Sequence, residues 1–179
     1  MLESLITSKT RIKLLLKFFL NSNTSAHLRG LESEFGESTN AIRLELNRME
    51  QAGLLVSRSD GNRKLFSANT RHPLFGDINQ LVRKHVGIDQ LVEQVIEKLG
   101  EVEKVYLTGA FARGQESPDI DILLVGGQID TLFLDKLIKK AASLVRKKVN
   151  YSLVDNGQFE QLAADMDSGE MLLLWQQGN

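Results

Sequence analysis

The chain has 179 residues, of which 42% are hydrophobic and 25% charged, and it contains no cysteine. This composition is typical of a soluble globular protein, and it excludes disulfides, thiolate metal sites and cysteine nucleophiles. The apolar run 14–20 is interrupted by Lys17 and is too short to cross a bilayer, so we expect a cytoplasmic protein with no membrane partner.

The two halves of the chain carry opposite net charge. Through His85 there are 13 basic and 8 acidic residues, and from Val86 onward there are 9 basic and 15 acidic residues. A basic half before an acidic half indicates two modules with different partners, and a polyanion is the simplest partner for the first. Chance is the alternative explanation of this asymmetry.

Three helices are predicted in the first half, each from an apolar repeat at helical spacing. The first begins after Ser8 or Thr10, either of which is suited to an N-cap. The other two are expected over 27–35 and from the N-cap Ser38 to about Ala52.

A hairpin is predicted after the third helix. The alternating stretches LLVSRS at 54–59 and NRKLFSA at 62–68 flank the pair Asp60-Gly61, which favours a tight turn. Three helices followed by a basic hairpin are typical of a winged helix-turn-helix, whose third helix enters the major groove. The segment 8–69 resembles the ArsR-like winged-helix regulators, through its core STNAIRLELNRMEQAGLL and its wing GNRKLF.

The polar face of the third helix is predicted to meet double-stranded DNA, because asparagine and arginine can read base edges with two hydrogen bonds. This predicted set is Thr39, Asn40, Arg43, Asn47 and Arg48. The hairpin residues expected on phosphates are Arg58, Asn62, Arg63 and Lys64. The alternative interpretation is a solvated polar face.

Regulators of the ArsR-like class often sense metals through cysteine and histidine ligands. Thiolate sensing is excluded here, and no cofactor is expected to be required for DNA binding. The histidines His27, His72 and His85 lie at the starts or ends of predicted helices, and we interpret them as surface or capping residues rather than ligands.

Residues 72–100 contain two further helical repeats, which Gly87 separates. The first is interpreted as a connector or a dimer helix, because a winged helix that reads a two-fold DNA site needs a symmetric partner. A homodimer is therefore predicted. Packing within the chain explains the same apolar stripe equally well.

Strand and helix patterns alternate in the second half, which indicates a small α/β module. Its stretch LTGAFARGQESPDIDILLV at 107–125 resembles the signature of the polymerase-β-like nucleotidyltransferases, particularly their minimal form. The predicted fold class is therefore α+β with two domains: a winged helix-turn-helix over 1–71, connector or dimerisation helices over 72–100, and a nucleotidyltransferase-like domain over 101–179.

Phosphoryl transfer needs a divalent metal held by carboxylates. Asp119 and Asp121 are spaced to lie on one face of a strand, and Mg²⁺ prefers oxygen ligands of this kind. The resemblance implies that these two aspartates are the metal ligands and, if the domain is active, catalytic residues. It also implies nucleotide-phosphate contacts at Gly109, Ala110, Arg113 and Gly114, and a third acid at the position of Asn150 or Ser152.

Three departures from the family pattern point toward lost catalysis. Ala110 stands where the family has a serine, and the loop 111–118 is about two residues shorter than usual. The third acid is replaced by a neutral residue, Asn150 or Ser152, which removes a metal ligand or general base. Because catalytic groups act as a unit, the loss of one costs most of the rate.

The sequence therefore leaves several functions open, and it does not decide whether the protein is an enzyme. The leading prediction is a dimeric DNA-binding transcriptional regulator whose nucleotidyltransferase-like domain binds a ligand such as a nucleotide, or is a structural module. The alternative is an active Mg-dependent nucleotidyltransferase that modifies a protein or a small molecule, with Asp155 or Glu160 as the replacement acid. An antitoxin-like partner of a separate toxin is a third hypothesis.

Overall fold

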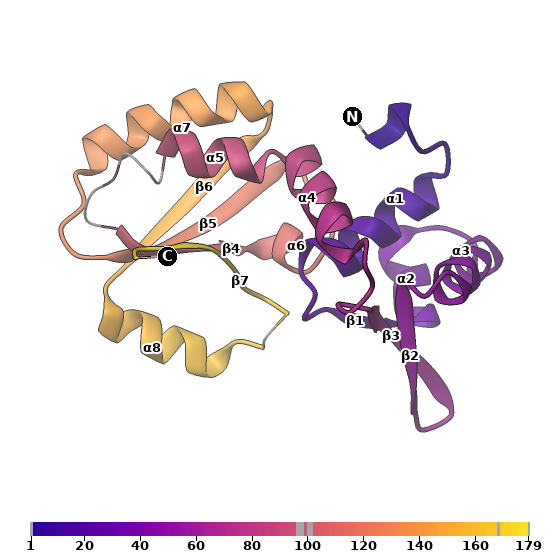
Figure 1. The fold of residues 1–179 in the computed structure, drawn as a ribbon. Helices are drawn as coiled ribbons and strands as arrows, with labels where there is room; N and C mark the ends of the chain where they lie inside the picture. Colours follow the sequence, from indigo (N-terminus) through magenta and orange to yellow (C-terminus); the bar gives the residue numbers. More distant parts are fainter. Residues whose placement is uncertain (1, 96–98, 100–101, 168, 179) are drawn as a thin grey trace. The chain divides into compact units, whose positions relative to one another are not determined.

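The computed structural model describes residues 2–95, 99, 102–167 and 169–178, which form two compact units (Figure 1). The first unit comprises Met1–His85 and Gly114–Glu116, and the second comprises Val86–Arg113 and Ser117–Asn179. The segment predicted as a connector, 72–100, contributes to both units, and its residues 96–98 and 100 lie outside the described part. The predicted division into three segments stays a prediction.

Two helices of the first unit begin at the predicted caps Ser8 and Ser38. The Ser8 hydroxyl accepts a hydrogen bond from the Arg11 N–H at 3.2 Å, and Ser38 accepts one from the Ala41 N–H at the same distance. The first helix continues as a π-helical turn, Leu16–Leu20, which the sequence pattern does not predict. The helices are α1 (Lys9–Leu15), α2 (Leu28–Phe35), α3 (Thr39–Gln51) and α4 (Phe75–Val86).

A three-stranded antiparallel sheet completes the first unit, in the order β1-β3-β2. Its strands are β1 (Ser25–His27), β2 (Leu55–Asp60) and β3 (Arg63–Ala68). Asp60 pairs with Arg63, so the hairpin turn is Gly61-Asn62, one residue later than predicted. Gly61 has φ +59°, a conformation that glycine adopts at no steric cost. The predicted hairpin is thus present with a shifted turn, and β1 is an additional strand.

The core of the first unit is built on the apolar face predicted for the third helix. Ile42, Leu46 and Met49 of α3 are buried, as are Phe18 and Phe19 of the π-helical turn. Burying a large apolar side chain contributes about 1.5–3 kcal/mol, so this stripe fixes α3 in the unit. The opposite face of α3 stays exposed.

The second unit contains a four-stranded mixed sheet in the order β6-β5-β4-β7. Strand β5 is parallel to β6 and antiparallel to β4, which is antiparallel to β7. The strands are β4 (Val102–Thr108), β5 (Asp119–Gly126), β6 (Lys148–Val154) and β7 (Leu172–Gln176). The strand patterns of the sequence predict the first three, whereas β7 forms in a tail for which no strand is predicted.

Helices cover both faces of this sheet. In Figure 1, α5 (Ile88–Val95) and α7 (Thr131–Val145) lie on one face and α8 (Asn156–Asp165) lies on the other. A short helix, α6 (Gly109–Ala112), follows β4 directly. The buried side chains include Val105, Leu107, Ile122 and Leu134. The chain is therefore an α+β protein. Within the described residues, no helix has both the length and the hydropathy that a bilayer crossing requires.

Candidate functional site

A groove of about 510 Å³ lies in the first unit, lined by residues of α2, α3 and the β2–β3 hairpin. Its apolar lining includes Leu46 and Phe66. Its basic lining residues are exposed and come from three elements: Arg29 of α2, Arg43 of α3, and Arg63 and Lys64 of β3. A concave surface lined by one sign of charge raises the local concentration of oppositely charged ligands.

Part of the predicted DNA-binding set lines this groove: Arg43, Asn47, Arg63 and Lys64, together with Asn62. The remaining members are not among its lining residues: Thr39, Asn40, Arg48 and Arg58. Arg48 lines a separate hollow with Arg11, and its guanidinium lies 3.2 Å from the Glu45 carboxylate.

Two charged or titratable groove residues are absent from the predicted set, His27 and Arg29. They come from the end of β1 and the start of α2, outside the core 38–55 and the wing 61–66 on which the resemblance rests. Their positions depend on how α2 packs beside the hairpin, which is a tertiary property. The sequence gives one indication of a role for Arg29, because it is a cation on the polar face of the helix predicted over 27–35.

The hairpin is tied to the end of α3 by the Glu50 carboxylate. Glu50 accepts hydrogen bonds from the Ser57 hydroxyl at 2.5 Å and from the Lys64 ammonium at 3.3 Å. The hydrogen bond from Ser57 lowers the pKa of Glu50 most, burial opposes it, and the Lys64 hydrogen bond and charge lower the pKa further. Glu50 therefore holds both strands of the hairpin as an ionised group.

Glu45 is a buried carboxylate on α3 that links this helix to α1. Arg11 donates to it at 2.9 Å and 3.2 Å, and the Ser8 hydroxyl donates at 3.3 Å. Burial raises the pKa of Glu45, but the hydrogen bond and charge of Arg11 and the charge of Arg48 outweigh burial, so the net pKa is lowered. An ion pair with Arg11 thus holds α3 against α1.

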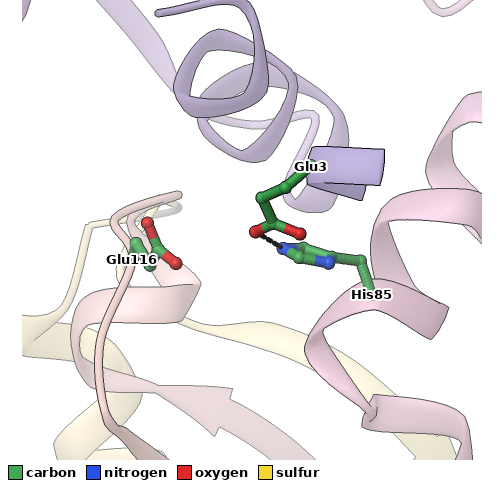
Figure 2. Close-up of side chains that lie close together, drawn as sticks. All are labelled: Glu3, His85 and Glu116. Atoms are coloured by element: carbon green, nitrogen blue, oxygen red, sulfur yellow. Dashed lines mark ion pairs between the residues drawn. The ribbon is translucent and has the colours of Figure 1, made fainter. Parts of the chain in front are cut away.

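Figure 2 shows Glu3, His85 and Glu116 side by side in the first unit, with ligand atoms within 4.8 Å of one another. His85 Nε2 lies 3.7 Å from Glu3 Oε1, and His85 Nδ1 accepts from the Leu2 N–H at 3.5 Å. Because Nδ1 accepts, the proton of the neutral ring is on Nε2, the nitrogen that faces the carboxylate. His85 therefore contacts the Glu3 carboxylate through Nε2 and the Leu2 backbone through Nδ1.

A second cluster lies in the second unit, where β5 and β6 begin side by side. Asn150 pairs in register with Asp121, and its amide nitrogen donates to Asp121 Oδ1 at 2.8 Å and lies 3.4 Å from Asp119 Oδ2. Lys148 Nζ is 3.8 Å from Asp119. Ser152 instead pairs in register with Leu123, farther along β5. Of the two candidates for the third position, Asn150 is therefore the residue beside the aspartates.

Gly109 follows β4 directly and lies against Asp121 in this cluster. It has φ +65°, and a Cβ added there would lie 2.4 Å from Asp121 Oδ2. Glycine is needed both for the backbone angle and for the space that the carboxylate occupies. The glycine turn thus contacts Asp121 even though the following loop is short.

The other predicted phosphate contacts are placed differently. Ala110 lies in α6 directly after Gly109, and the exposed Arg113 is the C-cap of that helix. Gly114 belongs to the first unit, where an added Cβ would lie 2.4 Å from the Lys17 Cα, so it is not part of this cluster. The structure brings Gly109 to Asp121, whereas Gly114 packs against Lys17 in the first unit.

The cluster fits a hard divalent cation in the chemistry of its donors. Two carboxylates converge on one amide nitrogen, and oxygen donors of this kind suit Mg²⁺. The predicted replacement acids are not part of the cluster. Asp155 caps α8 by accepting from the Gln158 N–H at 2.8 Å, and Glu160 is an exposed residue of α8.

No family model matches the chain, and no curated protein matches it either. About half of the chain is similar in structure to solved nucleotidyltransferase and toxin–antitoxin structures. A toxin–antitoxin crystal structure with AMP-PNP is 21% identical, with a TM-score of 0.40, over 51% of this chain and 74% of that chain. A putative nucleotidyltransferase from Sulfolobus solfataricus is 24% identical, with a TM-score of 0.34, over 52% of this chain and 82% of that chain.

Proposed function

We propose that the first unit binds double-stranded DNA as a winged helix-turn-helix and that the protein acts as a transcriptional regulator. The observation that carries this proposal is the groove that α2, α3 and the hairpin line together, with Arg29, Arg43, Arg63 and Lys64 as its cations. The order of helices and strands supports it, because a winged helix places its third helix and its hairpin on the same DNA-binding surface.

In this proposal the groove residues have two roles. Arg43 and Asn47 project from the exposed face of α3 and read base edges in the major groove. Arg63 and Lys64 of the hairpin, with Arg29 of α2, neutralise phosphates and position the unit. A homodimer would place two copies of α3 on the two halves of a symmetric operator.

DNA binding is tested by fluorescence anisotropy with a labelled duplex selected from a random-sequence pool. We expect log K to fall linearly with log salt between about 50 and 200 mM, by about 0.9 for each phosphate neutralised. The single strand of the same sequence is the control and is expected to bind more weakly. Equal affinity for the duplex and the single strand, or no binding at about 50 mM salt, would contradict the proposal.

A second candidate function is favoured by the convergence of Asp119 and Asp121 beside Gly109 in the second unit. We propose that these residues hold a nucleoside triphosphate with Mg²⁺. The two aspartates would hold the ion, which neutralises phosphate charge when bound, and the narrow Gly109 turn would let the backbone approach the phosphates. Asn150 supplies an amide where transfer requires a third acid, so binding with little turnover is the expected behaviour.

Nucleotide binding is tested by isothermal titration with ATP and Mg²⁺. We expect the double variant Asp119→Asn, Asp121→Asn to lose the binding heat of the wild-type chain, because the amides carry no charge to hold the ion. The matched control is Asp165→Asn, an exposed position at the end of α8. Equal heats in the double variant and the wild type would rule out this site. A separate toxin-like protein partner stays a prediction, which copurification would test.

A further inference from the structure

His27 differs from the other two histidines in the partners of its ring. Its Nδ1 lies 2.8 Å from the Lys64 carbonyl oxygen, and its Nε2 lies 2.9 Å from Asp60 Oδ2. A carbonyl and an ionised carboxylate only accept hydrogen bonds. A neutral imidazole has one N–H and satisfies one of these acceptors, whereas the imidazolium donates to both.

The remaining histidines have the opposite arrangement at Nδ1. His72 accepts there from the Leu74 N–H at 3.2 Å, and His85 accepts there from the Leu2 N–H at 3.5 Å. An accepting nitrogen carries no proton, so neither ring donates a hydrogen bond from Nδ1. His27 differs from both of these rings because each of its ring nitrogens faces an acceptor.

The two contacts of His27 join three elements of the first unit. The ring projects from the end of β1, at the N-cap of α2, and reaches the carbonyl of Lys64 on β3 and the side chain of Asp60 at the end of β2. His27 also lines the groove. A ring held in this way fixes the hairpin end relative to α2.

We propose that His27 is a positioning residue for DNA binding, which holds the hairpin through its imidazolium form and so makes the affinity of the groove depend on pH. The inference rests on the proposed DNA-binding function of the same groove. Histidine changes charge between about pH 5 and pH 8, so raising the pH removes the second donor and releases either Asp60 or the Lys64 carbonyl.

The charges around His27 act in both directions. Asp60 of β2 favours the imidazolium. The groove cations Arg29, Arg43, Arg63 and Lys64 oppose it, as does the positive end of α2. A phosphate bound in the groove offsets the charge of these cations and so favours the imidazolium form of His27. DNA binding and protonation of His27 therefore stabilise each other.

The test combines ring NMR on the full chain with DNA affinity as a function of pH. On lowering the pH through the histidine range, we expect the rise in DNA affinity to follow protonation of both His27 ring nitrogens, with the ring signals assigned through His→Gln variants. We also measure DNA affinity at about pH 6 and at about pH 8. The loss of affinity over this range should be about three- to five-fold larger in the wild type than in His27→Gln, which is the size expected for an exposed ion pair. Asp60→Asn is expected to flatten the same profile while leaving the histidine in place.

The salt dependence separates positioning from direct phosphate contact. If His27 acts through the hairpin, His27→Gln leaves the slope of log K against log salt unchanged, whereas a direct contact would reduce that slope by about one. An unchanged pH profile in His27→Gln, or an affinity change that does not follow protonation of the His27 ring, overturns the inference. Absence of DNA binding by the wild type at every pH overturns the proposed function instead, and the NMR measurement still tests the ring.

Discussion

Replacing Arg43 and Asn47 together with alanine is expected to weaken binding to a selected duplex by about 100-fold or more, because a two-hydrogen-bond base contact contributes about 1–3 kcal/mol of discrimination. Both side chains project from the exposed face of α3 into the groove. The apolar face that holds α3 is untouched by the changes, so the free energy of unfolding should stay within about 0.5 kcal/mol of the wild-type value.

The measurement is anisotropy on the selected duplex and on a scrambled duplex of the same length. Affinity for the selected duplex should fall more than affinity for the scrambled one, since base contacts specify and phosphate contacts do not. Arg58→Ala is the matched control, because Arg58 is an exposed hairpin cation that does not line the groove. If Arg58→Ala loses as much affinity for the selected duplex as the double variant, the loss reflects the removal of a positive charge and not of base contacts.

Gly109→Ala is expected to destabilise the second unit by about 2 kcal/mol and to abolish nucleotide binding at the aspartate cluster. A residue with a Cβ costs about 1–2 kcal/mol in the left-handed region that Gly109 occupies. The added methyl would also lie 2.4 Å from Asp121 Oδ2 and 3.2 Å from the Asp121 Cβ, so the carboxylate has to move away. The change therefore affects the backbone and the site together.

Thermal unfolding and titration with ATP and Mg²⁺ measure the two consequences. The midpoint of the second unit should fall by roughly 10 °C, from about 4–8 °C for each kcal/mol in a domain of this size. Gly127→Ala is the control, because its φ is not in the left-handed region and an added Cβ meets nothing within 4 Å. A midpoint in Gly109→Ala equal to that of Gly127→Ala would contradict the structural role of Gly109.

The sequence predicts those elements whose pattern is long and local. Ser38 and the stripe of Ile42, Leu46 and Met49 are sufficient to place α3 correctly. The short strand β1 and the edge strand β7 are not predicted from the sequence. Three residues of β1 carry no periodicity, and both strands are defined by pairing with residues distant in sequence.

The candidate sites were predictable in part for the same reason. Asp119 and Asp121 lie two residues apart on one strand, so their shared face follows from the chain alone. The choice between Asn150 and Ser152 requires the register between β5 and β6, which no local pattern fixes. The roles of His27 and Arg29 depend on the packing of α2 beside the hairpin, and that is set by the tertiary fold.

The strand order of the second unit has a consequence for synthesis on the ribosome. Strand β4 lies between β5 and β7, yet β7 comprises Leu172–Gln176 and is made about seventy residues after β4. One edge of β4, with its unpaired backbone N–H and C=O groups, therefore stays open in the nascent chain until β7 emerges. The sheet of the first unit is fully made at Ala68. The nascent second unit passes through a state open to pairing with another chain, and the first unit does not share this exposure.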